Sequence, residues 1–334
     1  MYQDNQAHAT AIQQWHTGSS VLPRPGMGAW INYGLGSENK NMPGFVVISP
    51  PYDASINCGN VFLPAQYRST VLRDASSPTG EKIRYLGTAH QDLKRQQQRL
   101  EFVSSLNAEH LKQQGGRDTL IEGMMSSFDM AFRMQMEAPG ILDLSSETPE
   151  TLASYGIGEK ETDSFGRQCL LARKLSESGV RFIQVSAPDN SWDHHGSIGK
   201  KLPESCRAAD KPTAGLLADL KRRGLLKDTL VIWGGEFGRT PVGQGDTNST
   251  LGRGHNPFGF TTVLAGGGVK GGFAYGETCQ IGFSSIKDRV HVHDLHATIL
   301  HLLGLDHELL TYRVNGRDFR LTDVAGSVVK DIIS

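Results

Sequence analysis

Residues 163–186 read Asp-Ser-Phe-Gly-Arg-Gln-Cys-Leu-Leu-Ala-Arg-Lys-Leu-Ser-Glu-Ser-Gly-Val-Arg-Phe-Ile-Gln-Val-Ser, and this stretch decides the fold that we expect. A helix predicted over 163–179 ends at a glycine and leads into an apolar strand over 181–186. The same pairing returns downstream, where a helix over 204–223 precedes a strand over 229–233; a strand over 260–265 and a helix over 294–303 follow. Strands separated by such helices predict an α/β fold with a doubly wound, mostly parallel sheet and helices on both faces.

The chain before residue 163 has fewer sequence features that predict secondary structure. Residues 44–49 form an apolar run closed by two prolines, which is typical of a buried strand. Two amphipathic or Met-rich helices are expected over about 90–114 and 117–137, and residues 139–155 are expected to form a surface excursion. Because no clear linker divides the chain, we expect a single domain over residues 1–334.

Composition excludes several classes of partner. The formal net charge is -1, with 34 Lys and Arg against 35 Asp and Glu, so no basic field predicts binding to nucleic acid. No run of 18 apolar residues occurs, so no membrane span is expected. The four cysteines form no CxxC pair, which argues against a zinc ribbon or a dense disulfide scaffold.

Three polar segments, over 192–196, 235–240 and 252–256, follow or neighbour predicted strands, and we expect them to be turns. Polar turns at the ends of neighbouring strands are where α/β sheets place metal or phosphate sites. In the first segment, Asp193 and His195 can offer a carboxylate oxygen and an imidazole nitrogen to one divalent ion. A solvated loop whose aspartate caps a helix is an equally good interpretation of this local sequence.

The other two segments add charge and a further imidazole. Glu236 and Arg239 follow a predicted strand, and Arg239 can hold a phosphate or sulfate oxyanion through its guanidinium fork. A Glu–Arg ion pair that orders the turn is the structural alternative. Arg253 and His255 each follow a glycine, and the two together suit either a metal site or an anion clamp.

Several blocks of the chain resemble one family in combination: residues 165–173, 192–196, 235–241, 264–272 and 294–300, with 16–19 and 24–30 upstream. They are similar to the "domain of unknown function 1501" family, which resembles a branch of the alkaline phosphatase/sulfatase superfamily in bacteria. The resemblance covers essentially the whole chain. It implies an alkaline phosphatase-like sheet with a site for divalent metal, such as zinc, calcium or manganese, at the strand ends.

The resemblance also implies roles for individual residues. Asp193 and His195 match one ligand pair, and His255 matches the histidine of a second pair. With Glu236 they make up the metal ligands that we expect. His8 aligns with the position of the sulfatase nucleophile, and Arg239 and Arg253 are expected to bind the anionic ester, so these three residues form the expected catalytic set.

Two features depart from the family pattern. The family usually begins with an export signal and a strand, whereas this sequence opens with a polar stretch that has no signal peptide, so we expect a truncated member of an exported or periplasmic family. Gly254 also stands where the family shows an aspartate before His255. Loss of carboxylates weakens a site for divalent cations.

Two functions remain open on this evidence. The first is a metal-dependent hydrolase of phosphate or sulfate esters, with a sulfated glycan as one candidate substrate. The second is a non-catalytic protein that binds an anionic glycan or another anionic partner through the same cleft. Because of the departures from the family pattern, the sequence is also compatible with a hydrolase that is inactive.

Overall fold

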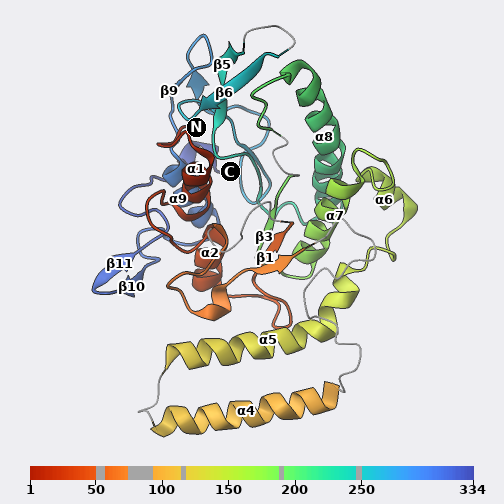
Figure 1. The fold of residues 1–334 in the computed structure, drawn as a ribbon, viewed down its shortest axis with the longest axis vertical. Helices are drawn as coiled ribbons and strands as arrows, with labels where there is room; N and C mark the ends of the chain where they lie inside the picture. Colours follow the sequence, from red (N-terminus) through yellow and green to blue (C-terminus); the bar gives the residue numbers. More distant parts are fainter. Residues whose placement is uncertain (50–56, 74–92, 114–117, 188–191, 246–249) are drawn as a thin grey trace.

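Mixed helices and short strands make up the part of the chain that the computed structural model describes, which is residues 1–49, 57–73, 93–113, 118–187, 192–245 and 250–334 (Figure 1). The helices are α1 (His8–Thr17), α2 (Met27–Leu35), η1 (Ala65–Tyr67), α4 (Leu93–Gln113), α5 (Thr119–Leu142), α6 (Pro149–Ser154), α7 (Asp163–Glu177), α8 (Ile198–Arg222), α9 (Val292–Leu302) and η2 (Lys330–Ile332). The strands are β1 (Phe45–Ile48), β2 (Thr70–Leu72), β3 (Phe182–Val185), β4 (Val231–Trp233), β5 (Gly238–Gln244), β6 (Gly252–Asn256), β7 (Val263–Ala265), β8 (Glu277–Thr278), β9 (Ser285–Lys287), β10 (Tyr312–Val314) and β11 (Arg317–Phe319).

A parallel sheet of three strands, in the order β2-β1-β3, forms the centre of the fold. All four residues of β1 are buried, and they alternate between two hydrophobic clusters. Val46 and Ile48 pack in a cluster with α5 and α7, whereas Phe45 and Val47 pack in a cluster with α2 and α9. Helices therefore cover both faces of this sheet, as the near-continuous apolar run of a buried parallel strand requires.

The remaining described strands pair antiparallel. β4 pairs with β7, β5 with β6, β8 with β9 and β10 with β11, each pair as a separate two-stranded sheet. The strands expected over 229–233 and 260–265 are therefore antiparallel partners, rather than neighbours in the parallel sheet. Helix-to-strand spacing alone cannot show this, because the chain between them returns through the β5–β6 ribbon instead of a crossover helix. The doubly wound, alkaline phosphatase-like arrangement stays a prediction.

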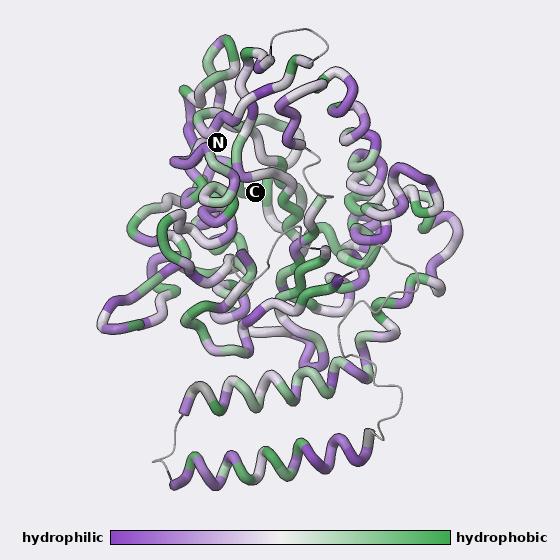
Figure 2. The backbone as a smooth tube through the Cα atoms, in the orientation of Figure 1, coloured by the Kyte–Doolittle hydropathy of each residue, from purple (hydrophilic) through white to green (hydrophobic). Residues whose placement is uncertain are grey.

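Helices α4 and α5 lie side by side and form an arm across one end of the molecule, in which α5 packs against η1 and α7 and α4 is the outer helix (Figure 1). The expected surface excursion over 139–155 is in part buried, because Leu142, Leu144 and Tyr155 belong to the cluster around β1. None of the described helices combines the length and apolar character that a membrane crossing needs. Figure 2 shows the hydrophobic stretches gathered at the central sheet, while the arm mixes polar and apolar residues along its length.

Candidate metal centre

The loop between β3 and α8 carries Asp193 and His195, and backbone hydrogen bonds fasten it to β6. The Arg253 N–H donates to the His194 carbonyl at 2.9 Å, and the Ile198 N–H donates to the Leu251 carbonyl at 3.0 Å. A Cβ on Gly252 would lie 2.0 Å from the carbonyl carbon of His195, so this close approach of two backbones requires glycine. This contact places His255, three residues after Gly252, beside His195 of the loop.

One of the three segments that were expected to be turns, 252–256, is a strand, and another, 235–240, is a strand from residue 238 onward. Residues 238–244 and 252–256 form the β5–β6 ribbon, in which Arg239 is directly opposite His255. Glycine-rich polar sequence favours a turn locally, but two such segments can satisfy each other's backbone groups across a ladder. The pairing therefore places Arg239 and His255 on adjacent strands.

The N-terminal residues also lie beside this loop and β6, although they are far from both in the sequence. The Tyr2 N–H donates to the Val290 carbonyl at 3.0 Å, and the Gln3 N–H donates to the Pro257 carbonyl at 2.9 Å. Helix α1 then begins at His8, whose Nδ1 lies 2.7 Å from Glu236 Oε1. The residue expected at the position of a nucleophile is thus placed among the expected metal ligands.

Four side chains converge on one point: His8, Asp193, His195 and His255. Each offers one ligand atom, and these atoms all lie within 4.8 Å of one another. The Asp193 carboxylate lies 3.2 Å from His8 Nε2, 3.0 Å from His195 Nε2 and 3.4 Å from His255 Nε2. The structure therefore brings three of the four expected ligands, Asp193, His195 and His255, close to His8.

Each of the three histidines is oriented by an acceptor behind its ring. Nδ1 of His8 faces Glu236 Oε1, Nδ1 of His195 faces Gln244 Oε1 at 2.9 Å, and Nδ1 of His255 faces the Gln6 carbonyl at 2.6 Å. A carbonyl or an ionised carboxylate can only accept, so these contacts place the proton of a neutral ring on Nδ1. Every Nε2 lone pair is then directed into the cluster.

This donor set fits a metal ion. Nε2 of His195 and Nε2 of His255 are 3.0 Å apart, and two lone pairs at that distance gain stabilisation from a cation that both can bind. Nε2 of His8 is buried and makes no hydrogen bond within the described part of the chain. In metal sites, each ligating histidine usually donates its other ring N–H to an acceptor, which fixes the orientation of the ring.

Arg239 supplies positive charge beside the cluster. Its guanidinium donates to Asp193 Oδ1 and lies over the Phe237 ring, 5.5 Å from the centroid. Partial burial would raise the pKa of the Asp193 carboxyl, but the charge and hydrogen bond of Arg239 outweigh burial and lower that pKa. Asp193 is therefore ionised at neutral pH, as a metal ligand must be.

The other expected site residues have different positions. Glu236 contacts His8 Nδ1 rather than the convergent atoms, so the structure places it behind a ligand instead of among the ligands. Arg253 lies on β6 opposite Gly243, two positions before His255. At Gly254, a Cβ would have its nearest neighbour at 3.5 Å, so the position has room for a side chain although it lacks one. Gln6 and Gln244 were not expected at all, and neither lies in a motif that would single it out.

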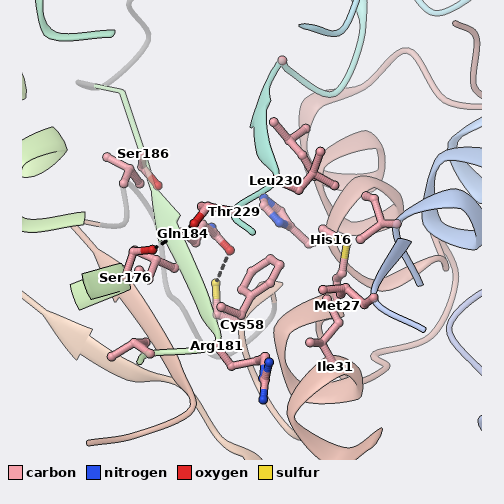
Figure 3. Close-up of a pocket in the computed structure, with 18 of the residues that line it drawn as sticks. His16, Met27, Ile31, Cys58, Ser176, Arg181, Gln184, Ser186, Thr229 and Leu230 are labelled. Atoms are coloured by element: carbon pink, nitrogen blue, oxygen red, sulfur yellow. Dashed lines mark hydrogen bonds between the residues drawn. The ribbon is translucent and has the colours of Figure 1, made fainter. Parts of the chain in front are cut away.

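A cavity of about 680 Å³ lies beside this centre, and Glu236 forms part of its lining. Figure 3 shows Met27 and Ile31 of α2 on one side and Gln184 of β3 on the other, with Leu230 and His16 near the upper end. Burial lowers the pKa of His16 to about 4, so this lining imidazole is neutral at neutral pH. Charged residues also line the cavity, namely Glu38, Glu177, Arg181, Asp228 and Glu236, and the last of these contacts His8.

The family assigned to this chain has no established function. The family described as "Protein of unknown function (DUF1501)" matches residues 1–333. No curated protein and no solved structure matches the chain.

Proposed function

Since the chain belongs to the DUF1501 family, whose function is unknown, we propose from its own residues that it is a metal-dependent hydrolase of phosphate or sulfate esters. The observation that carries this proposal is the convergence of three imidazole Nε2 atoms and the Asp193 carboxylate, with an acceptor behind each ring. The proposal includes an alkaline phosphatase-like arrangement of the α/β elements. The motif blocks that resemble the alkaline phosphatase/sulfatase superfamily support the choice of ester.

The donor set favours zinc or manganese over calcium. Three imidazole nitrogens and one carboxylate match the ligands that zinc binds in proteins, whereas calcium takes six to eight oxygen ligands. Asp193 is the one carboxylate among the four convergent residues. The site is therefore proposed to hold a single ion.

The residues around the ligands have separable roles in this proposal. A bound divalent ion supplies Lewis-acid polarisation of the ester and lowers the pKa of a bound water. Arg239 is proposed to bind the anionic group through its guanidinium, since it is held at the rim by Asp193 and the Phe237 ring. Glu236 keeps the His8 ring in the tautomer that binds metal.

The direct test is an assay of the metal-depleted protein after addition of zinc, manganese or calcium. Hydrolysis of p-nitrophenyl phosphate and p-nitrophenyl sulfate would be followed at each metal. We expect one metal to bind with a stoichiometry of one and to restore turnover of at least one ester. Stoichiometric metal binding without turnover of either ester would reject the hydrolase.

The alternative is a non-catalytic protein that binds an anionic glycan at the same centre. It is favoured by one observation: with glycine at position 254, the cluster has a single carboxylate, which is also bound by Arg239. The metal-loaded protein would then bind heparin or a sulfated oligosaccharide without releasing sulfate. Calorimetry together with sulfate release separates the two functions.

Glu236→Gln is expected to weaken metal binding by about 10–100-fold, because the neutral amide no longer fixes Nδ1–H on His8 with a charged acceptor. Glu277→Gln, at an exposed surface ion pair with Lys287, is the matched control and should bind metal as the wild type does. Metal titration by calorimetry measures both. Equal affinity in the two variants would contradict the role of Glu236 as a support for His8.

A further inference from the structure

Strand β3 is partly exposed although it belongs to the central sheet. All four residues of β1 are buried, whereas all four residues of its neighbour β3 keep part of their surface exposed. Helices α2 and α7 both contact β3, so neither face of the strand is uncovered. The exposure is onto the cavity of about 680 Å³, which is lined by every residue from 179 to 187. A cavity that met one face of a strand would be lined by alternate residues, so this cavity lies along the edge of β3.

The edge of β3 that lines the cavity has no strand beside it within the described part of the chain. β3 is the last strand in the order β2-β1-β3, and its Phe182 and Ser186 N–H groups donate to carbonyls of the β1 segment. In a ladder, the backbone groups of successive residues point alternately to the two sides of the strand. The N–H and C=O groups of Ile183 and Val185 therefore point toward the cavity. Four backbone groups need hydrogen-bond partners there.

Strand β4 lies on the other side of the cavity. Leu230 and Ile232 line the cavity from this side, and β7 is the strand that pairs with β4 in the described structure. Both β3 and β4 end toward the metal centre, since Asp193 follows β3, Glu236 follows β4, and both contact His8. We refer to this cavity as the strand slot, with residues 179–187 on one side and 228–230, 232 and 234–236 on the other.

The strand slot is open at both ends. Glu38, which pairs with Arg181 where β3 begins, and Asp228, just before β4, are exposed lining residues. Gly235 is an exposed lining residue just after β4. Figure 3 shows Arg181 and Ser186 toward opposite ends of β3 beside the cavity. An extended chain can therefore enter the slot and lie along β3.

The charged residues that line the strand slot already have partners. Each of them is ion-paired within the chain: Glu38 with Arg181, Glu177 with Arg173 and Arg223, Asp228 with Lys227, and Glu236 with His8. Helices α2 and α9 contribute apolar side chains to the lining, namely Met27, Ile31, Leu295 and Ile299. These described lining residues therefore favour an occupant that is neutral and largely apolar.

The backbone edge decides which neutral occupant fits. A small apolar molecule would cover the side chains but would leave the N–H and C=O groups of Ile183 and Val185 unpaired, which is costly for buried groups. Water would pair these groups but would leave the apolar side chains of α2 and α9 hydrated. An extended peptide has N–H and C=O groups at the repeat of the strand and side chains for both faces. Peptides of this kind bind to open sheet edges as an added strand.

We propose that the strand slot binds an extended, apolar segment of a partner polypeptide, which adds a strand beside β3. Helices α2 and α9 would cover one face of the added strand, and the end of α7 would cover the other. A strand that is covered on both faces is apolar along its whole length, as β1 is, so the segment is expected to be rich in valine and isoleucine. A segment of about five residues, the usual length of a strand, spans the slot.

Fluorescence anisotropy with a labelled peptide tests the proposal on the full chain. The peptide has a run of about five valine and isoleucine residues, the usual length of a strand, with a lysine at each end for solubility. We expect saturable one-to-one binding. The same peptide, N-methylated at every second residue, keeps its side chains but loses the hydrogen bonds to one edge, and we expect it to bind at least about 10-fold more weakly.

Two variants of Ile183 separate the backbone edge from the side chain. Ile183→Pro removes an N–H that points into the slot, while the N–H groups that donate to β1 belong to alternate residues and are retained. It should bind the unmethylated peptide at least about 10-fold more weakly. Ile183→Ala keeps the N–H and should bind as the wild type does. Thermal melting shows whether each variant is folded, and the methylated peptide tests the same hydrogen bonds on the unchanged protein.

Four results would overturn the proposal. The first two are absence of saturable binding and equal binding of the two peptides, because the backbone edge would then have no role. The third is saturable binding of the neutral dye Nile red that the peptide does not displace, which would assign the slot to a small apolar ligand. The fourth is dimerisation in sedimentation that the peptide reverses, which would assign the slot to a second copy. Peptide binding requires no ester and no turnover, so its failure leaves the proposed hydrolase independently testable.

Discussion

Asp193→Ala should abolish stoichiometric metal binding, with a loss of affinity of about 100-fold or more. Changes to groups behind a metal ligand already cost about 10–100-fold, and Asp193 is itself a convergent donor. Its removal leaves three imidazoles and the Arg239 guanidinium without the carboxylate that compensates them. Calorimetric titration of the metal-depleted protein with zinc measures this loss.

Asp318→Ala is the matched control, because Asp318 is an exposed partner of Arg313 in the β10–β11 hairpin. This variant should bind zinc with wild-type affinity. Thermal melting of both variants shows that each is folded. If Asp193→Ala binds one zinc as tightly as the control does, the four convergent residues are not the metal site.

Arg239→Ala is the second change with a large expected effect. It should lower kcat/KM for the preferred aryl ester by about 100–1,000-fold, the range found when a single stabilising donor is removed from an active site. Zinc stoichiometry should remain one, since the four ligand side chains are retained. Arg239→Lys should give an intermediate rate, because a lysine keeps the charge but loses the fork that grips an oxyanion.

Arg313→Ala is the control for charge removal at an exposed position, and its rate should equal that of the wild type. Steady-state kinetics on the zinc-loaded proteins and metal analysis of the same samples separate catalysis from metal binding. Loss of zinc from Arg239→Ala would assign Arg239 to holding Asp193 in place. An unchanged kcat/KM would remove Arg239 from the binding of the ester.

Local pattern predicted the long helices and two of the three central strands, β1 and β3, because these depend on residues that are close in the sequence, but helix α2 and strand β2 were not expected. The helix over 163–179 and the strand over 181–186 correspond to α7 and β3 within a few residues. The predicted helix at 204–223 begins earlier, at Ile198, since the helix continues through Pro203 in its second turn. Proline usually marks a helix boundary, so this extension had no signal in the sequence.

The site was predicted in part. Asp193, His195 and His255 were recognised from residue chemistry and motif resemblance, and the structure brings them together. Glu236 was placed among the ligands because its carboxylate suits a metal, but its position is set by the ring of His8. The acceptors Gln6 and Gln244 had no signal, since any residue with a backbone carbonyl or an amide can serve behind a histidine.

The sequence by itself determined the donor chemistry and the main α/β elements, because side-chain type and apolar periodicity are local properties. Only the tertiary structure decided which donors share one point. His8 and Glu236 are 228 positions apart, and they meet because the N-terminal residues pair along the segments at 257 and 290. Gly252 lets β6 lie against the loop of His195, which sets His255 beside it. Contacts between distant segments depend on packing and strand pairing, and no local pattern encodes them.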